Sequence, residues 1–359
     1  MKNQECDKGC FCFFRTTLIA FFFLCPGVLF SQTDTVARHF SFTGYIEGYY
    51  SYDFADPSDK LKPPYFYSFN RHNEPNINLA MLKASYLTNK FRANAALMAG
   101  TYSQYNLAAE PELLRYLYEL NVGVKLSRKD LWLDAGVMSS HIGFESAIGK
   151  DCWSLTRSIM AENSPYYETG VKLGYGSDNG KWYAAILFLA GWQRMKPVEG
   201  NSLPSFGTQL QYRPTDKIVF NSSSFIGTDK PDSARKMRYF HDLYGIFKLN
   251  AKLSLQAAFD VGAEQKEKNS SSYNFWYTWV AGMSYSWNRR LTSGLRLEYY
   301  QDKNAVIIST ETGAPMAVYG ASLNFDITVL KNLLWRIEGR LLNGKDDVFL
   351  EDGRAVNAN

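Results

Sequence analysis

The sequence is poor in the side chains that form disulfides and metal sites. Its 359 residues include five cysteines and four histidines, and four of the cysteines fall within the first 25 residues. The fifth, Cys152, has no partner for a disulfide, and the four histidines are scattered as His39, His72, His141 and His241. Zinc sites need several such ligands at short spacings. We therefore expect no metal, no cofactor and no disulfide, and interpret Cys152 as a small buried apolar side chain.

Long apolar runs are equally scarce. The longest, TTLIAFFFLCPGVLF, follows three basic residues and gives way to the polar SQTDT. It is too short to span a membrane comfortably and has the layout of a secretory signal peptide. We expect cleavage near Ser31, so that residues 1–31 are removed and residues 32–359 form one exported domain. The alternative, a lipoprotein signal, fits poorly because Cys25 follows bulky Phe and Leu residues.

Charge of one sign is not in excess either. Residues 1–31 carry three of the 39 basic and two of the 35 acidic side chains, which leaves 36 against 33. Such a balance gives no reason to expect a nucleic-acid partner. No apolar run after residue 31 is long enough for a transmembrane helix, which argues against a helical membrane protein.

Aromatic residues, by contrast, are abundant. They make up 16% of the chain, with 24 Tyr and 8 Trp. A membrane β-barrel uses such side chains in aromatic girdles at both membrane interfaces. A tyrosine-rich secreted β-sandwich would have a similar composition, so the pattern along the chain has to decide.

Apolar and charged side chains alternate along many short segments. In residues 333–342, LLWRIEGRLL, the charged side chains share one parity, and residues 40–54, FSFTGYIEGYYSYDF, alternate in the same way. Period-two alternation predicts β-strands with one apolar and one polar face. Fifteen strands are predicted in all, at residues 40–54, 75–87, 91–103, 114–127, 130–139, 166–176, 181–191, 204–213, 217–227, 236–248, 252–264, 274–287, 290–301, 314–327 and 332–343.

The connections between these strands also alternate. Short turns such as SRKD and GSDNG follow the even-numbered strands, and connections of eight or more residues follow the odd-numbered ones. This rhythm is typical of an all-β, antiparallel up-and-down transmembrane β-barrel with short periplasmic turns and long outer loops. The apolar faces would then meet lipid. Because bacterial barrels have an even number of strands, we expect about 16, with the last strand missing or incomplete in a chain truncated at its C-terminal end.

A family resemblance supports this fold. The segments GYIEGYYSYDF, NRHNEPNIN, HIGFES, WSLTRS, SPYYETGVKLGY and GWQRMKPVEGNS, within residues 44–202, resemble the OmpL-like β-barrel porins of the outer membrane. The resemblance extends over nearly all of the chain after residue 40. It implies an outer-membrane barrel of a Gram-negative bacterium that forms a pore, and a closing strand with a terminal aromatic residue, which this sequence lacks.

A barrel of this size would leave a water-filled channel for small hydrophilic solutes and ions. General diffusion porins narrow the channel with a loop at the place of residues 140–165, and the resemblance implies the same here; an outer loop packed on its neighbours is the alternative. The candidate pore-lining and constriction residues are Glu47, Arg115, Glu119, Glu145, Lys150, Arg157, Glu162, Arg296, Glu298, Arg336, Glu338 and Arg340. Both signs are represented, so we predict no strong ion preference.

Two other functions have to be weighed. The aromatic stretches PPYFYSFN at 63–70 and GWQRM at 191–195 would suit a substrate-selective channel, for example for oligosaccharides, or a surface-binding barrel. Ser139 and His141 would share a face of a strand, but no GxSxG motif is present and we expect no enzyme and no catalytic residues. Expected partners are outer-membrane lipid, the permeating solutes and the barrel-assembly machinery. The oligomeric state stays open.

Overall fold

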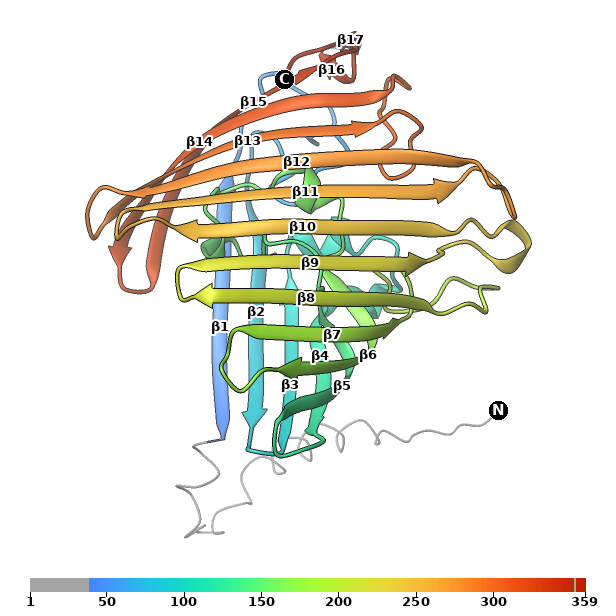
Figure 1. Cartoon of the computed structure of the whole chain (residues 1–359). Helices are drawn as coiled ribbons and strands as arrows, with labels where there is room; N and C mark the ends of the chain where they lie inside the picture. The colour runs from blue at the N-terminus through green and yellow to red at the C-terminus, as the bar shows by residue number, and fades with distance from the viewer. Residues whose placement is uncertain (1–38, 352) are drawn as a thin grey trace, which may run out of the picture. The chain divides into compact units, whose positions relative to one another are not determined.

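The described residues, 39–351 and 353–359 of a computed structural model, are built mainly of β-strands (Figure 1). The signal peptide expected at residues 1–31 lies outside them. Residues Ser41–Asn359 form one compact unit. The strands are β1 (Phe40–Tyr50), β2 (Pro75–Leu87), β3 (Phe91–Ala99), β4 (Leu117–Lys125), β5 (Asp130–Ser139), β6 (Tyr167–Gly176), β7 (Trp182–Leu189), β8 (Ser205–Thr215), β9 (Ile218–Gly227), β10 (Arg238–Lys248), β11 (Leu253–Gln265), β12 (Tyr273–Ser286), β13 (Leu291–Asp302), β14 (Met316–Leu330), β15 (Leu333–Gly344), β16 (Phe349–Glu351) and β17 (Arg354–Val356).

Strands β1 to β15 follow one another in a single sheet. In the described part of the chain this sheet has 15 strands in sequence order, and the registers that are defined between neighbours are antiparallel. The predicted up-and-down meander is therefore confirmed. Short turns and long connections alternate as expected, because the hairpin turns at one end of the strands need only a few residues.

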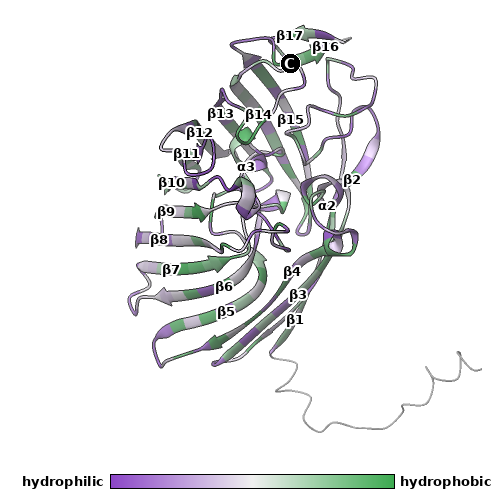
Figure 2. Ribbon diagram, turned by 90° about the vertical axis from the view of Figure 1, so that its right-hand side faces the viewer, coloured by the Kyte–Doolittle hydropathy of each residue, from purple (hydrophilic) through white to green (hydrophobic). Residues whose placement is uncertain are grey.

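The sheet is apolar on the outside and polar on the inside. Phe42 and Leu82 are exposed on the outer face at 80% and 73%, whereas Glu168 and Asp242 are fully buried on the inner face. Figure 2 shows the sheet curling so that α2 (Thr101–Asn106) and α3 (Ile159–Glu162) lie between strands β8–β12 and strands β1–β4. This arrangement is the reverse of a soluble protein, and it suits a sheet whose outer face meets lipid.

Four predicted strand bounds differ from the structure by three or more residues; one of them is the end of the strand expected over 314–327, which extends to Leu330. The strand expected over 91–103 ends at Ala99, because Gly100 turns the chain with φ 128° and a Cβ there would lie 2.4 Å from the Asn78 carbonyl oxygen. The strand expected from residue 114 starts only at Leu117, after the 3-10 helix Glu112–Tyr116. The first strand ends at Tyr50 rather than at residue 54.

The helical pieces are short. Besides α2 and α3 there are 3-10 helices at Glu112–Tyr116, Gly149–Asp151 and Asp232–Ala234. Ser158 is the N-cap of helix α3, and its hydroxyl accepts a hydrogen bond from the Ala161 amide. Within the described residues, no helix is long and apolar enough to cross a membrane.

The enclosed side also contains an apolar cluster that the alternation does not predict. It joins inward side chains of the wall to side chains of the long connections, and every member is buried. Its larger members are Tyr65, Phe66, Ile142, Ile159, Leu187, Leu189, Phe225, Phe240, Trp276, Tyr300, Ile308, Leu342 and Phe349. The long connections therefore pack against the inner wall of the sheet and do not extend freely into solvent.

The sheet edges are β1 and β15. In residues 39–351 and 353–359 no strand pairing joins these two edges. Strands β16 and β17 form a separate hairpin, after which the chain returns to β15: Ala358 pairs antiparallel with Asn343, and Leu342 exchanges backbone hydrogen bonds of 2.6 and 3.0 Å with Asn359. This pairing lies at the place where the sequence predicts a sixteenth strand.

Candidate pore lining

The connection between β5 and β6, residues 140–166, crosses the enclosed side of the sheet; we call it the crossing loop. It leaves the sheet beside β6 yet contacts β15, which is far away in the sheet order. Arg336 of β15 donates to the carbonyl oxygens of Gly149 at 2.7 Å and Cys152 at 2.9 Å, and Arg340 donates to that of Arg157 at 3.0 Å. A loop can reach both walls only by lying inside the curl.

Arg296 on β13 is the centre of the contact between loop and wall. It is 1% exposed, and its guanidinium donates to the carbonyl oxygen of Thr156 at 2.6 Å and to the Thr156 hydroxyl at 3.0 Å. The same group forms ion pairs with Glu298 and Glu338 at 3.3 Å and with Glu145 at 3.8 Å. Three carboxylates thus surround one guanidinium, whose fixed fork of donors suits such a position.

The carboxylates bind the loop directly as well. Glu338 accepts hydrogen bonds from the Thr156 amide at 2.7 Å and the Thr156 hydroxyl at 2.6 Å, and Glu298 accepts one from the Ile159 amide at 2.7 Å. We call Glu145, Arg296, Glu298, Arg336, Glu338 and Arg340 the inner-wall ion network. Charge-assisted hydrogen bonds in a buried setting are among the stronger ones, so this network holds the loop in place.

The remaining charges of the crossing loop serve its own shape. Arg157 is fully buried and donates to the carbonyl oxygens of Ser146, Leu155 and Ala147. Glu145 accepts hydrogen bonds from the Ser158 amide, at 2.9 Å, and from the Ser158 hydroxyl. The predicted constriction residue Arg157 therefore lies inside the loop and does not project from it, whereas Glu145 also reaches Arg296 of the wall at 3.8 Å.

Glu162 joins the crossing loop to the first long connection. Its carboxylate accepts hydrogen bonds from the amides of Tyr67 at 3.0 Å and Ser68 at 3.2 Å, and the neighbouring Asn163 side chain donates to the Tyr65 carbonyl oxygen at 3.2 Å. Burial raises the pKa of Glu162 to about 7, because removal from water disfavours the charged form more than these donors favour it. The two connections are thus linked at a group that titrates near neutral pH.

The other predicted lining residues take separate positions. Glu47 on β1 accepts a hydrogen bond from Asn78 at 3.0 Å, and Glu119 on β4 pairs with Lys83. Lys150 is exposed on the crossing loop and pairs with the adjacent Asp151. Arg115 lies in the 3-10 helix before β4 and donates to carbonyl oxygens of residues 108 and 110, so it is outside the strand in which the alternation places it.

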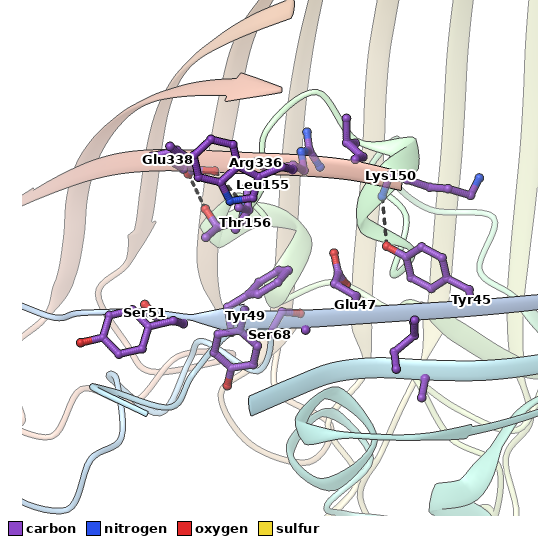
Figure 3. A pocket seen from close by; sticks show the side chains of 18 of the residues that line it. Tyr45, Glu47, Tyr49, Ser51, Ser68, Lys150, Leu155, Thr156, Arg336 and Glu338 are labelled. Atoms are coloured by element: carbon purple, nitrogen blue, oxygen red, sulfur yellow. Dashed lines mark hydrogen bonds between the residues drawn. The ribbon is translucent and has the colours of Figure 1, made fainter. Parts of the chain in front are cut away.

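A cavity of about 2110 Å³ lies between β1 and β15 and reaches the crossing loop. Figure 3 shows its polar side: Tyr45 and Glu47 project from β1, and Glu338 projects from β15 toward Thr156 of the crossing loop. The Lys150 amide donates to the Tyr45 hydroxyl at 3.3 Å. The cavity is therefore bounded on one side by charged and hydroxyl groups and extends along the unpaired edges of the sheet.

Several polar residues of the inner wall are missing from the sequence prediction. Thr156, the anchor of the crossing loop, has no signal in the sequence. His141 bonds to Glu168 at 2.8 Å and to the Ser224 carbonyl oxygen at 2.8 Å, which ties the start of the loop to β6 and β9. The neighbouring Asp242 is also buried, and alternation along β10 could have placed it on the inner face.

The described residues contain no group of three or more His, Cys, Asp and Glu side chains that could hold a metal ion. Cys152 is buried, its thiol donates weakly to the Ser146 carbonyl oxygen, and burial raises its pKa. A thiol in such surroundings is unreactive.

Comparisons with known proteins agree with this arrangement. Residues 39–359 match the family described as "Putative beta-barrel porin-2, OmpL-like". An anion-selective porin from Comamonas acidovorans has a similar structure, with a TM-score of 0.56 and 10% identity over 86% of this chain and 90% of that chain. The outer membrane channel DcaP of Acinetobacter baumannii is similar with a TM-score of 0.55 and 14% identity over 89% of this chain and 94% of that chain.

No curated protein matches the sequence. The two solved structures, at these identities, show the fold alone, and the family match covers the whole of the sheet. Together with the inside-out sheet and its crossing loop, these findings give the assignment: the chain belongs to the OmpL-like β-barrel porin family of the outer membrane.

Proposed function

We propose that the protein is a porin through which small hydrophilic solutes and ions diffuse passively across the outer membrane. One observation carries the proposal: the sheet exposes apolar side chains outward and encloses charged ones, such as Arg296 and Glu298, at 1% and 2% exposure. Lipid satisfies the outer face, and the enclosed polar face favours water and polar solutes.

The crossing loop is our candidate for the constriction. It lies on the enclosed side between distant strands, where it narrows the path. The twelve residues predicted to line the pore remain a proposal as a set; nine of them, including Glu145, Arg157 and Glu162, either belong to this loop or bind it. Because their charges are largely paired, we expect weak selectivity between anions and cations.

Planar bilayers test the proposal. The chain refolded in detergent should produce stepwise conductance in potassium chloride, with a reversal potential near zero in a salt gradient and no saturable block by oligosaccharides. A protein that inserts, shows the heat-dependent mobility of a folded barrel and yet never conducts would contradict it. Strong block by one class of sugar would favour a selective channel.

The structure offers no specific support for the two other functions. The aromatic side chains Tyr65 and Phe66 of the first connection are buried in the apolar cluster, and Trp192 packs edge-on against Phe225 and Phe240, so these rings are already occupied. The ring nitrogens of His141 contact Glu168 and a backbone carbonyl oxygen, away from a serine hydroxyl. A channel explains these contacts better than a sugar-binding site or a hydrolase does.

Export and assembly follow from this proposal. Residues 1–31 would direct the chain through the general secretory pathway of a Gram-negative bacterium, and the barrel-assembly machinery would insert it. Detection of the protein in outer-membrane fractions, with an N-terminus near residue 32, would test both.

A further inference from the structure

The hairpin turns at one end of the strands carry an excess of positive charge. The seven turns are residues 88–90, 126–129, 177–181, 216–217, 249–252, 287–290 and 331–332. They hold nine Lys and Arg side chains against two Asp, and every turn holds at least one cation. Figure 1 shows the turns β8–β9, β10–β11 and β12–β13 at the same end of their strands.

The other end of the strands has no such excess. The seven long connections that join β1 to β2, β3 to β4 and so on to β14 hold 14 basic and 14 acidic side chains. Several of these carboxylates bind backbone amides of another connection, as Glu162 does. The two ends of the sheet therefore differ in charge, and the positive charge belongs to the turns.

The cations of the turns, which we call the turn cations, are all exposed. They are Lys90, Arg128, Lys129, Lys181, Lys217, Lys252, Arg289, Arg290 and Lys331. In the described part of the chain none of them forms an ion pair, whereas Arg296 and Arg336 of the inner wall are paired. Neighbouring hairpins lie roughly 10 Å apart in a sheet, close to the distance of about 8 Å over which physiological salt screens charge. The turn cations therefore repel one another unless an anionic surface faces them.

Exposed aromatic side chains lie directly beside these cations. Trp182 follows Lys181 and stacks on Tyr212 of the neighbouring strand with ring centroids 4.1 Å apart, and Trp287 lies two positions before Arg289. Both tryptophans are about half exposed. Trp and Tyr on the outside of a barrel lie at the level of the head groups. The adjacent cations are thus within reach of lipid phosphates.

We propose that the turn cations bind the anionic head groups of phospholipids in the leaflet on their side of the membrane. A phospholipid such as phosphatidylglycerol offers acyl chains to the exposed rings and a phosphate to the cation beside them. The cations occur in all seven turns, which suits an extended surface. A soluble acidic protein or a dissolved anion would neutralise the charge but leave the rings in water. The proposal rests on a barrel that spans the membrane and not on conduction.

Two matched variants of the full chain test this proposal, and each loses five exposed cations. The turn variant carries Lys217→Gln, Lys252→Gln, Arg289→Gln, Arg290→Gln and Lys331→Gln. The control variant carries the same change in the long connections, at Lys196→Gln, Lys230→Gln, Lys266→Gln, Lys268→Gln and Lys303→Gln. Both have the same net charge, so a difference between them reports the place of the charge. Heat-dependent mobility on detergent gels confirms that each variant is folded.

Quenching of tryptophan fluorescence by brominated lipids measures the preference of the barrel for each head group. In vesicles of phosphatidylethanolamine and phosphatidylglycerol at 50 mM sodium chloride, the wild type and the control variant should bind brominated phosphatidylglycerol about fivefold more strongly, the factor that one Lys or Arg near an anionic surface gives. The turn variant should prefer it by less than about twofold. In the wild type, 1 M sodium chloride should remove the preference, because exposed charges are screened.

Three results would overturn the proposal. A wild type that binds both lipids equally would leave the turn cations to an acidic protein or a dissolved anion. Equal losses in the turn and control variants would show that net charge alone matters, and a preference that persists in 1 M salt would exclude exposed cations as its source. The salt series needs no variant, and all of these measurements are independent of conductance.

Discussion

At the scale of single residues, Arg296 has the most demanding environment in the wall. Its neutral replacement Arg296→Met would leave Glu145, Glu298 and Glu338 without their shared cation in a buried site. We expect the free energy of unfolding to fall by about 3–5 kcal/mol, the usual result of removing one partner from a buried ion pair. Urea unfolding in detergent micelles, followed by tryptophan fluorescence, measures this loss.

The matched control is Arg289→Met in the exposed turn before β13, which should change the free energy of unfolding by no more than about 0.5 kcal/mol. A similar small effect at Arg296 would show that the inner-wall ion network does not hold the crossing loop.

Glu162 predicts a dependence of stability on pH. Because burial raises its pKa from an ordinary value near 4.5 to about 7, the unfolded chain loses this proton before the folded chain does. The stabilising contribution is therefore complete below about pH 4.5, declines as the pH rises, and is gone above about pH 7, a change of roughly 3 kcal/mol. Glu162→Gln should remove this part of the pH profile while keeping an acceptor for the Tyr67 and Ser68 amides.

Unfolding of the wild type and of Glu162→Gln at pH 4.5, 6 and 8 gives the difference directly, and Glu199→Gln in an exposed connection is the control. Parallel pH profiles for wild type and Glu162→Gln would contradict the assignment of a raised pKa to this carboxyl group.

Sequence patterns predict which face of the sheet these side chains point to, but they do not predict which residues the side chains contact. Alternation alone places Arg296, Glu298 and Glu338 on the inner face, since their strands are regular. Their contacts with the crossing loop join positions 139–182 residues apart, as from Ile159 to Glu298, and no local pattern contains that information. The pairing of Glu162 with the first connection is unpredictable for the same reason.

At the scale of elements, the crossing loop should be held by a small number of bonds. Thr156→Ala together with Glu338→Gln removes a hydroxyl and a charge that meet at 2.6 Å. We expect a less ordered loop, seen as larger and noisier single-channel conductance, with a loss of stability of about 3–6 kcal/mol for two hydrogen bonds to a charged group. Ser146→Ala, which leaves the contact with the wall intact, is the control.

Unchanged conductance and noise in the Thr156 and Glu338 variant would indicate that the loop does not narrow the conducting path. The same recording made with wild-type protein supplies the reference for both variants.

The bounds of β3 and the orientation of β7 could not be predicted from the sequence. The apolar alternation of β3 continues past Ala99, so the sequence predicts a longer strand, but the chain turns at Gly100 and starts α2 beside the Asn78 carbonyl oxygen. The two-sided apolar segment of β7 leaves its orientation open; Ile186 and Phe188 face outward, and Leu187 enters the inner apolar cluster. Both cases depend on neighbours that are distant in sequence.

At the scale of the whole molecule, the two faces of the sheet should respond in opposite ways to a new charge. Leu297→Arg places a cation on the outer face in the middle of β13 and should destabilise the barrel in lipid vesicles by about 2–4 kcal/mol. Gln256→Arg on the inner face of β11 introduces the same side chain on the polar side and should cost far less. Urea titrations of folded protein in vesicles compare the two.

Equal losses of stability for the two arginine variants would mean that the outer face is not in contact with hydrocarbon.

The fold could be predicted from the sequence, because period-two alternation and the alternation of short and long connections both follow from local chemistry. The apolar cluster on the enclosed side could not be predicted in this way, because residues such as Phe225 and Trp276 are apolar at inward positions where alternation predicts polar side chains.

The crossing loop also has a mechanical consequence. Its hydrogen bonds with Arg336 and Arg340 connect β15 to β5 and β6, the strands that the loop joins. The curvature of the sheet is thereby fixed from within, even where β1 and β15 are not paired. If β15 begins to separate from β14, these hydrogen bonds to the crossing loop must break before more of the sheet can unfold. The stability of this sheet edge therefore depends on contacts with the opposite side of the enclosure.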